Sequence, residues 1–324
     1  MTDADWRPTA TLTALRRRAD ALATTREFFR ARKVLEVETP ALVNAPVSDV
    51  NLGSVRVDVP GIATPLWLHT SPEYAMKRLL AAGAGDIYQL CHVYRGAERG
   101  RQHNPEFTML EWYRLGFSLE DLMNEVAALV RELLGAAGTS LPVEFVSYRD
   151  AVHKYAGFDP LDADRGVLVA AAQSLGFDAE RSATAGRDEL LDLIVGAHVG
   201  PALGSNALTF LHRYPASQAA LAQLDPADPR VALRFELYHH GIELANGYHE
   251  LASGAEQRQR FEADLASRAA RGLPTATLDR RLLAALDAGL PDCAGVALGF
   301  DRVLMLATGA TRIDEVLAFP VERA

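Results

Sequence analysis

The densest group of chemically capable side chains lies between residues 93 and 113, in the string VYRGAERGRQHNPEFTMLEWY. Its arginines and histidine offer donors to phosphate oxygens, its aromatic ring offers a stacking face, and its carboxylates can bind cations. The string HNPEFTMLEWY alternates polar, aromatic and acidic residues along a predicted strand, which a solvated loop would not require. The side chains concerned are Arg95, Arg99, Arg101, His103, Glu106, Phe107 and Glu111.

Two later segments could complete a binding site. Residues 243–251, ELANGYHEL, carry Glu243 and Glu250, whose carboxylates could bind Mg²⁺ or an amino-acid ammonium group. An ordinary exposed strand face would also explain them. Residues 295–302, GVALGFDR, combine glycines that permit close backbone approach with Arg302 at a predicted helix start, where it could face phosphates. Taken alone, this second segment also fits a routine strand-to-helix junction.

The familiar nucleotide and hydrolase motifs are missing. No GxxxxGK[ST] string occurs, the run 83–85 lacks the third glycine of a dinucleotide fingerprint, and HExxH and GxSxG are absent. A bound nucleotide would therefore be held by side chains on the sheet.

Composition indicates a soluble globular protein with a large core, because 49% of the 324 residues are hydrophobic and 23% are charged. The net charge of -9 gives no general attraction to nucleic acid, although a local basic patch could exist within an acidic total. Cys91 and Cys293 lie far apart without CxxC spacing, which predicts buried free thiols and neither a zinc site nor a disulfide framework. No secretory signal or membrane-spanning run is present, so we expect a cytoplasmic protein with no membrane partner.

Periodicity predicts helices and strands that alternate along the chain. An amphipathic helix over 11–32 leads into a strand that ends at Pro40, and residues 231–252 form a hairpin with its turn at 239–241. The region 161–199 is a helical insertion. We expect one α+β domain over residues 1–324, with helices flanking a largely antiparallel sheet. Further strands are expected near 66–69, 87–94 and 294–298, and further helices at 73–82, 118–135, 255–271 and from about residue 302.

Taken together and in this order, these segments resemble class II aminoacyl-tRNA synthetases, and lysyl-tRNA synthetase most of all. The helix and strand ending at Pro40 are similar to motif 1, which builds the dimer interface in that family. Arg95 with HNPEFT is similar to motif 2, and GFDR is similar to motif 3. The resemblance covers nearly the whole chain and implies a class II catalytic domain, use of ATP and Mg²⁺, and a homodimer.

The resemblance implies an ATP site built from motifs 2 and 3. Arg95 would contact the α-phosphate, Phe107 and Arg302 would enclose the adenine ring, and Arg95 and Arg302 would be the catalytic residues. The family usually has Arg-x-Glu in motif 2, whereas this chain has Arg95-Gly96-Ala97 followed by Glu98. Either the backbone of residues 96–97 or the Glu98 side chain would then contact adenine. The other implied ATP-binding residues are His103, Asn104, Glu243, Leu244 and Gly299.

The same resemblance implies a site for a lysine-like amino acid, whose cationic groups need carboxylate partners. Glu243 and Glu250 would hold Mg²⁺ or substrate. Ala297 stands where lysyl-tRNA synthetases usually have glycine, and one methyl group typically changes discrimination by about 1 to 3 kcal/mol. The implied substrate residues are Ser71, Pro72, Glu73, Glu111, Tyr113, Asn246, Glu250 and Ala297.

The expected acceptor is a protein. The motif 1 helix begins close to residue 1, so we expect no anticodon-binding OB-fold and no binding of a tRNA anticodon. This organisation, together with TSPEYAMKRLL, YPASQAALAQ and ELANGYHEL, resembles the elongation factor P (R)-β-lysine ligase family. The resemblance implies activation of (R)-β-lysine or lysine as an adenylate and its transfer to a lysine side chain of elongation factor P. Two alternatives remain open: a truncated synthetase that charges tRNA, and a synthetase-like regulatory subunit without catalysis.

Overall fold

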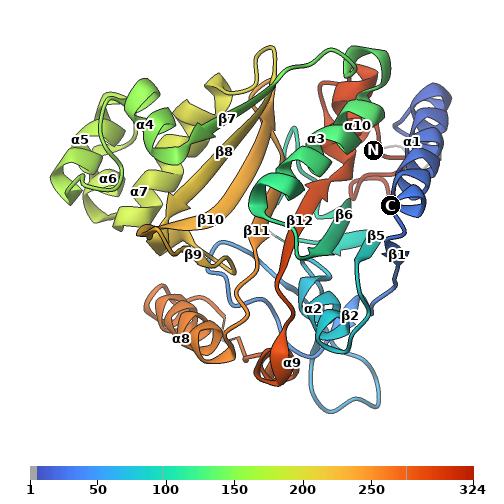
Figure 1. The fold of residues 1–324 in the computed structure, drawn as a ribbon, viewed down its shortest axis with the longest axis horizontal. Coiled ribbons are helices and arrows are strands. Elements are labelled where there is room, and N and C mark those ends of the chain that lie inside the picture. Colours follow the sequence, from blue (N-terminus) through green and yellow to red (C-terminus); the bar gives the residue numbers. More distant parts are fainter. Residues whose placement is uncertain (1–5, 97, 275) are drawn as a thin grey trace. The chain divides into compact units, whose positions relative to one another are not determined.

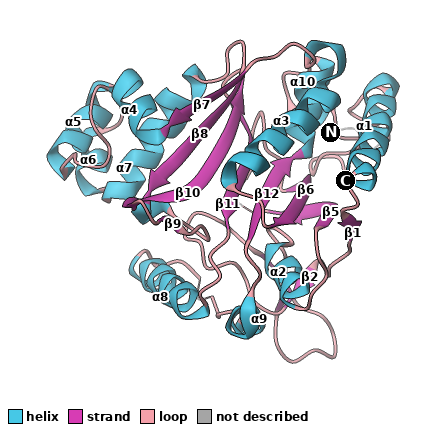
Figure 2. Cartoon of the chain, in the orientation of Figure 1, coloured by secondary structure: helices cyan, strands magenta, loops and turns pink. Residues whose placement is uncertain are grey.

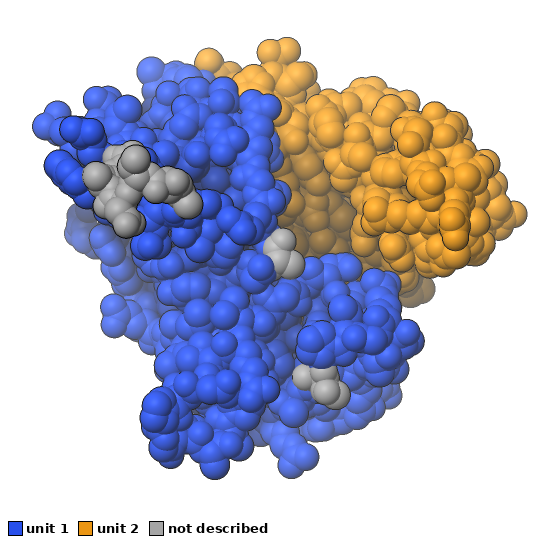
Figure 3. Space-filling view, turned by 180° about the vertical axis from the view of Figure 1, so that it is seen from behind, with its two compact units in different colours: residues 1–116, 128–139, 252–324 blue, residues 117–127, 140–251 orange. Residues whose placement is uncertain are grey.

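The structure is a computed structural model that describes residues 6–96, 98–274 and 276–324. Its contacts group the chain into two compact units, which Figure 3 colours separately. Unit 1 comprises residues 1–116, 128–139 and 252–324, and unit 2 comprises residues 117–127 and 140–251. Helix α3 (Leu119–Leu134) begins in unit 2 and ends in unit 1. The single domain expected over residues 1–324 stays a prediction.

The sheet strands of unit 1 follow the order β1-β5-β6-β12 (Figures 1 and 2). Strand β1 runs parallel to β5, while β6 is antiparallel to both of its neighbours. A smaller antiparallel sheet has the order β2-β4-β3. The bounds are β1 Leu35–Glu36, β2 Leu42–Val43, β3 Val55–Val57, β4 Leu66–Leu68, β5 Ile87–Tyr94, β6 Glu106–Leu115 and β12 Cys293–Gly299.

Helices cover one face of the β5-β6-β12 strands. The Phe29 ring of α1 stacks on Tyr88 of β5 with centroids 4.4 Å apart and meets Trp112 of β6 edge-on at 5.4 Å. Side chains alternate between the faces of a strand, so the residues next to Tyr88 and Trp112 point to the opposite face. The helices of unit 1 are α1 Leu12–Ala31, α2 Glu73–Ala81, α8 Gly254–Ala270, α9 Arg280–Gly289 and α10 Phe300–Thr308, with short 3-10 turns at Gly135–Ala137 and Ile313–Glu315.

Unit 2 contains strands in the order β11-β10-β8-β7, with β9 beside β10. Strands β7 and β8 are parallel and the other pairs are antiparallel. The strands are β7 Val143–Ser147, β8 Leu208–Pro215, β9 Leu224–Asp225, β10 Asp228–His239 and β11 Ile242–His249. The helices are α4 Tyr148–Ala156, α5 Arg165–Ser174, α6 Ala179–Thr184 and α7 Arg187–Ile194, followed by a π turn at Val195–Val199 and 3-10 turns at Gly200–Ala202 and Ala216–Gln218.

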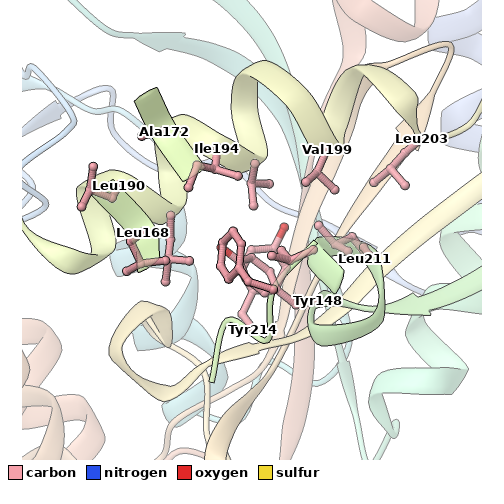
Figure 4. Packing of buried hydrophobic residues seen from close by; sticks show 14 of the residues in the cluster. Tyr148, Leu168, Ala172, Leu190, Ile194, Val199, Leu203, Leu211 and Tyr214 are labelled. Atoms are coloured by element: carbon pink, nitrogen blue, oxygen red, sulfur yellow. The ribbon is translucent and has the colours of Figure 1, made fainter. Parts of the chain in front are cut away.

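The helices of unit 2 share one hydrophobic core with its strands. Figure 4 shows Tyr148 and Tyr214 lying among aliphatic side chains from α5, α7 and β8, with the two ring centroids 4.8 Å apart. Leu168, Leu190 and Leu211 are fully buried in this cluster. The helical region 161–199 therefore packs against the strands of its own unit, as an insertion should, and burial of these apolar side chains stabilises it.

The expected elements are largely confirmed, and so is the α+β class. The strand before Pro40 is shorter than expected, because only Leu35 and Glu36 pair with β5. Helix α10 begins at Phe300, two residues earlier than expected, with Gly299 as its N-cap. Cys293 is a buried free thiol as expected, while Cys91 is only partly buried. Across the described ranges, no helix combines the length and apolarity needed to cross a membrane.

Candidate active site

The face of the β5-β6-β12 strands opposite to Tyr88 and Trp112 carries the acidic residue Glu111. It lies opposite Gln89 of β5 and Ala297 of β12 in the strand register. Directly paired residues share a face, so β12 presents only small residues beside the larger side chains of β6. Gly295 lies opposite Tyr113, and Gly299 lies opposite Met109. Small residues of β12 therefore lie beside Glu111 and Tyr113 on this face.

Glu111 is 2% exposed, and hydroxyl groups donate to both of its carboxylate oxygens. Ser71 Oγ donates to Oε2 at 2.7 Å, and Tyr113 OH donates to Oε1 at 2.6 Å. The backbone N–H of Glu73, in the first turn of α2, donates to Ser71 Oγ at 3.0 Å, and Pro72 is the N-cap residue of that helix. The structure thus brings together the predicted substrate residues of unit 1: Ser71, Pro72, Glu73, Glu111, Tyr113 and Ala297. This cluster can bind an ammonium group, because a buried carboxylate held by hydroxyl groups attracts a cation.

Two arginines frame the expected nucleotide region. The Arg95 guanidinium lies 5.1 Å from the centre of the Phe107 ring, and its Nη1 atom pairs with Glu98 Oε1 at 3.2 Å. Arg302 Nη2 lies 2.7 Å from His103 Nε2. Burial, followed by the Arg302 charge, lowers the pKa of His103 below its usual value of 6.5, so the imidazole is neutral at pH 7 and can accept a hydrogen bond from Arg302.

The Arg95 side chain has a hydrogen-bond donor that no described residue accepts. Its Nε atom is buried and has no hydrogen-bond partner among the residues that the structure describes. A buried unpaired donor is costly, and a phosphate oxygen would satisfy it. The Gly96 N–H donates to the Gly53 carbonyl at 2.9 Å, which occupies the donor that an adenine contact would need. Ala97 lies outside the described residues, so Glu98 is the motif 2 candidate whose side chain the structure places.

Asn104 holds the end of the motif 2 loop in place. Its side-chain amide donates to the Glu106 carbonyl at 2.6 Å, and its carbonyl oxygen accepts from the Val321 N–H at 3.1 Å. Both ends of this side chain therefore bind protein. Asn104 thus orders the loop that carries His103.

A pocket of about 510 Å³ opens beside His103 and Asn104. Four arginines and two carboxylates line it, so its walls carry a net positive charge within an acidic chain. A positively charged cleft attracts anions and raises their local concentration. The charged residues lining it are Arg99, Arg101, Arg312, Arg323, Asp314 and Glu322.

Asp301 and Arg18 were missed in the sequence analysis. Asp301 is 1% exposed, accepts from the Thr108 N–H at 2.7 Å and pairs with Arg18. Arg18 also donates to Thr108 Oγ1 at 3.2 Å. These contacts fix the first turn of α10, which carries Arg302, against β6, which carries Phe107. Asp301 directly precedes Arg302 in sequence, but no local pattern indicates its partner 283 residues away.

Unit 2 carries the remaining predicted residues on the β10-β11 hairpin. Asn246 lies opposite Glu236, and Glu243 lies opposite Tyr238. A β-bulge between Leu237 and Tyr238 shifts the register by one residue, which changes the alternation of side chains. Glu243 and Asn246 therefore share a face although their spacing is odd. Leu244 is buried in the core, so only its backbone remains for nucleotide binding.

Arg234 organises this face of the hairpin. It donates to Glu236 Oε1 at 2.7 Å and to Asn246 Oδ1 at 3.3 Å, and its guanidinium lies 4.3 Å from the Tyr214 ring centre. Tyr238 OH donates to the other Glu236 oxygen at 2.6 Å. Burial raises the pKa of Tyr238, and the charges of Glu236 and Glu243 raise it further, which places both carboxylates near that phenol. Glu236, which the sequence analysis did not single out, thus lies on the same hairpin face as Glu243 and Asn246.

Glu243 and Glu250, the residues expected to hold Mg²⁺ or substrate, lie on β11 and directly after it. Six residues lie between them in sequence, and their roles as ligands of Mg²⁺ or of substrate stay predictions. Glu250 is 2% exposed and forms an isolated bridge with Ala222. Glu236 and Glu243 are the carboxylates that the hairpin brings together. The described part of the chain holds no cluster of three or more His, Cys, Asp or Glu suited to a metal, so an ion here would need phosphate or water oxygens as well.

Comparison with known proteins agrees with the motifs. The model of the class II tRNA synthetase family (D, K and N) matches residues 3–323. The chain is 50% identical over 325 residues to the elongation factor P–(R)-β-lysine ligase of Klebsiella pneumoniae, with 99% of both chains covered. It is 49% identical over 328 residues to the ligase of the same name from Vibrio cholerae, with 100% of both covered. The Salmonella agona ligase is 50% identical over 325 residues and 99% of both chains.

Proposed function

This chain belongs to the class II tRNA synthetases of the D, K and N type, and from that premise we propose that it is an ATP-dependent ligase for a lysine-like amino acid. The proposed substrate is (R)-β-lysine, or lysine, and the proposed acceptor is a lysine side chain of elongation factor P. Relatives that match over the full length carry the name of that activity. The observation that carries the proposal is Glu111, a buried carboxylate of β6 with the hydroxyl groups of Ser71 and Tyr113 on its two oxygens.

The first proposed step joins the amino acid to AMP. A carboxylate oxygen of the amino acid attacks the α-phosphorus of ATP, the bond to the β-phosphate oxygen breaks, and pyrophosphate leaves. This carboxylate is ionised at neutral pH, so the step needs no general base, only alignment and charge stabilisation. Arg95 would contact the α-phosphate through its unpaired Nε donor, and Arg302 would lie at the phosphates with neutral His103.

ATP use follows from membership of the family, and Mg²⁺ generally accompanies it. Glu243 and Glu250 are the proposed ligands, because carboxylates and nucleotide phosphates are the oxygen ligands that Mg²⁺ prefers. Glu236 lies on the same face of the hairpin as Glu243. When bound, the ion would neutralise charge that develops on the phosphates. Arg234 and Tyr238 each hold one oxygen of Glu236, which fixes the direction of its carboxylate. The basic pocket beside His103 suits the departing pyrophosphate.

The second proposed step moves the aminoacyl group to a protein amine. The uncharged amine of an acceptor lysine attacks the adenylate carbonyl, the bond to the phosphate oxygen breaks, AMP leaves, and the amine loses a proton as the amide forms. Such a reaction with a translation factor would take place in the cytoplasm. By the same resemblance, the motif 1 helix α1 would form a homodimer interface.

Ala297 would shape the amino-acid site. Its methyl group points to the same face as Glu111, directly across from it in the strand register. A methyl group in place of the hydrogen of glycine moves the substrate backbone away from β12. That displacement suits an amino acid whose amine lies one carbon further from the carboxylate. One methyl group can change the free energy of discrimination between two such substrates by about 1 to 3 kcal/mol.

Amino-acid-dependent exchange of pyrophosphate into ATP tests the first step. We expect exchange with (R)-β-lysine or lysine, and none with ornithine, which is one methylene shorter. Arg95→Ala should abolish exchange, whereas Arg56→Ala, at an exposed arginine paired with Asp58, should not change it. Failure of both lysine isomers to support exchange would refute the proposal.

The acceptor is tested separately with labelled amino acid, ATP, elongation factor P and tRNA in one mixture. We expect label on the protein. Label on tRNA alone would favour the truncated synthetase, and a chain that forms no AMP at all would favour the regulatory subunit.

A further inference from the structure

Lys77 on α2 is a buried lysine. Its side chain is 1% exposed, and its Nζ atom lies 2.7 Å from Glu73 Oε1, one helical turn earlier. Lysine is almost never fully buried unless it is paired, because an ammonium group loses its hydration. An exposed pair with this spacing would need no explanation, but a buried pair is often no better for stability than two apolar residues. The pair therefore calls for a role beyond holding α2 together.

The partner of Lys77 belongs to the predicted amino-acid site. Glu73 is the first residue of α2, and its side chain is 15% exposed, so part of this side chain remains accessible. Its backbone N–H binds Ser71 Oγ, and the same hydroxyl donates to Glu111. Lys77 thus binds the Glu73 side chain, while the Glu73 backbone binds the hydroxyl group that holds Glu111, so the four residues lie in one polar group.

Lys77 fixes which way Glu73 can point. The ammonium binds Oε1, so rotation of the carboxylate away from the site would break a buried ion pair. The N-terminus of α2 adds a second favourable interaction, because the helix dipole attracts a negative charge in the first turn. Lys77 thus binds one oxygen of the Glu73 carboxylate, and this bond fixes the orientation of the other oxygen.

We propose that Lys77 is a positioning residue for the amino-acid site, which acts by holding the Glu73 carboxylate toward the substrate. This inference rests on the proposed function, because it assigns Lys77 a part in binding the lysine-like substrate. Lys77 does not touch the substrate itself. Its effect reaches the amino acid through Glu73 and leaves the nucleotide region around Arg95 and Arg302 unchanged.

Lys77→Met tests the proposal, since methionine has similar length and no charge. We expect the KM for the amino acid in pyrophosphate exchange to rise about 10- to 100-fold, the loss typical when the partner that orients a binding side chain is removed. The KM for ATP should stay within about twofold. Lys77→Arg keeps a charged donor and should recover a large part of the loss. Lys154→Met, the same change at an exposed lysine of α4, is the matched control.

A double variant separates positioning from general stabilisation. If Lys77 acts through Glu73, then Lys77→Met combined with Glu73→Gln should raise the amino-acid KM no further than Glu73→Gln alone. Multiplying effects would overturn the proposal, and so would an unchanged amino-acid KM in Lys77→Met or equal losses for ATP and amino acid. If Lys77→Met does not fold, the same single and double comparisons are made with Lys77→Gln, which also removes the charge, and an unchanged amino-acid KM in that variant would overturn the proposal. Wild-type protein without amino-acid-dependent exchange would instead refute the proposed function, and this inference with it.

Discussion

Replacing Glu111 by Gln removes one charge from the proposed amino-acid site and keeps the shape of the side chain. Ser71 and Tyr113 both donate to this carboxylate, and each hydroxyl can rotate to donate to the amide oxygen or accept from the amide nitrogen. The fold should therefore tolerate the change. The substrate ammonium loses a hydrogen bond to a charged group, which is worth about 1.5 to 3 kcal/mol. This corresponds to a fall in kcat/KM for the amino acid of roughly 10- to 150-fold.

Pyrophosphate exchange measured against amino-acid concentration and then against ATP concentration gives the two constants separately. The loss should appear with the amino acid, while the KM for ATP stays unchanged, because Glu111 lies away from Arg95 and Arg302. Tyr113→Phe, which removes one neutral donor and keeps the charge, should cost less, about 0.5 to 1.5 kcal/mol. A fall of less than about threefold in Glu111→Gln would refute the assignment of Glu111 as the cation-binding carboxylate.

Three further changes test other parts of the account. Arg18→Met should lower the free energy of unfolding in urea by about 3 to 5 kcal/mol, because it leaves the Asp301 carboxylate buried without its cation. Arg16→Met, at an exposed arginine of the same helix, should change this free energy little. A loss below about 1 kcal/mol in Arg18→Met would contradict the pairing. His103 has a lowered pKa, so between that pKa and 6.5 the folded protein binds fewer protons than the unfolded chain and loses stability as the pH falls. His103→Gln should therefore lose less stability than wild type between pH 7.5 and pH 5.5, and an equal loss would refute the assignment. Ala297→Leu should raise the KM for the amino acid roughly tenfold, because the larger side chain lies across from Glu111 in the strand register, and the KM for ATP should not change. An amino-acid KM equal to that of the wild-type protein would show that the substrate lies elsewhere.

The sequence predicted what depends on local pattern. Strand alternation in HNPEFTMLEWY places Glu111 and Tyr113 on one face, and the structure joins them by a hydrogen bond. The helix over 11–32 and the hairpin over 231–252 were also predictable, because each has a regular spacing of apolar residues. The motif order further identified the family, which the family model over residues 3–323 shows.

What the sequence could not supply depends on irregular geometry and distant contacts. The bulge at Leu237 and Tyr238 brings Glu243 to the face that carries Glu236, and no simple period of two can predict this shift. The Arg18–Asp301 pair joins residues from opposite ends of the chain, so only the folded structure reveals it.

Mass spectrometry of elongation factor P after incubation with this protein, ATP, Mg²⁺ and (R)-β-lysine tests the central claim most directly. We expect a mass increase of one lysyl residue, located on a single lysine side chain and absent when ATP is omitted or when Arg95→Ala replaces the wild-type protein. Unmodified elongation factor P, under conditions in which the same preparation supports amino-acid-dependent pyrophosphate exchange, would contradict the account.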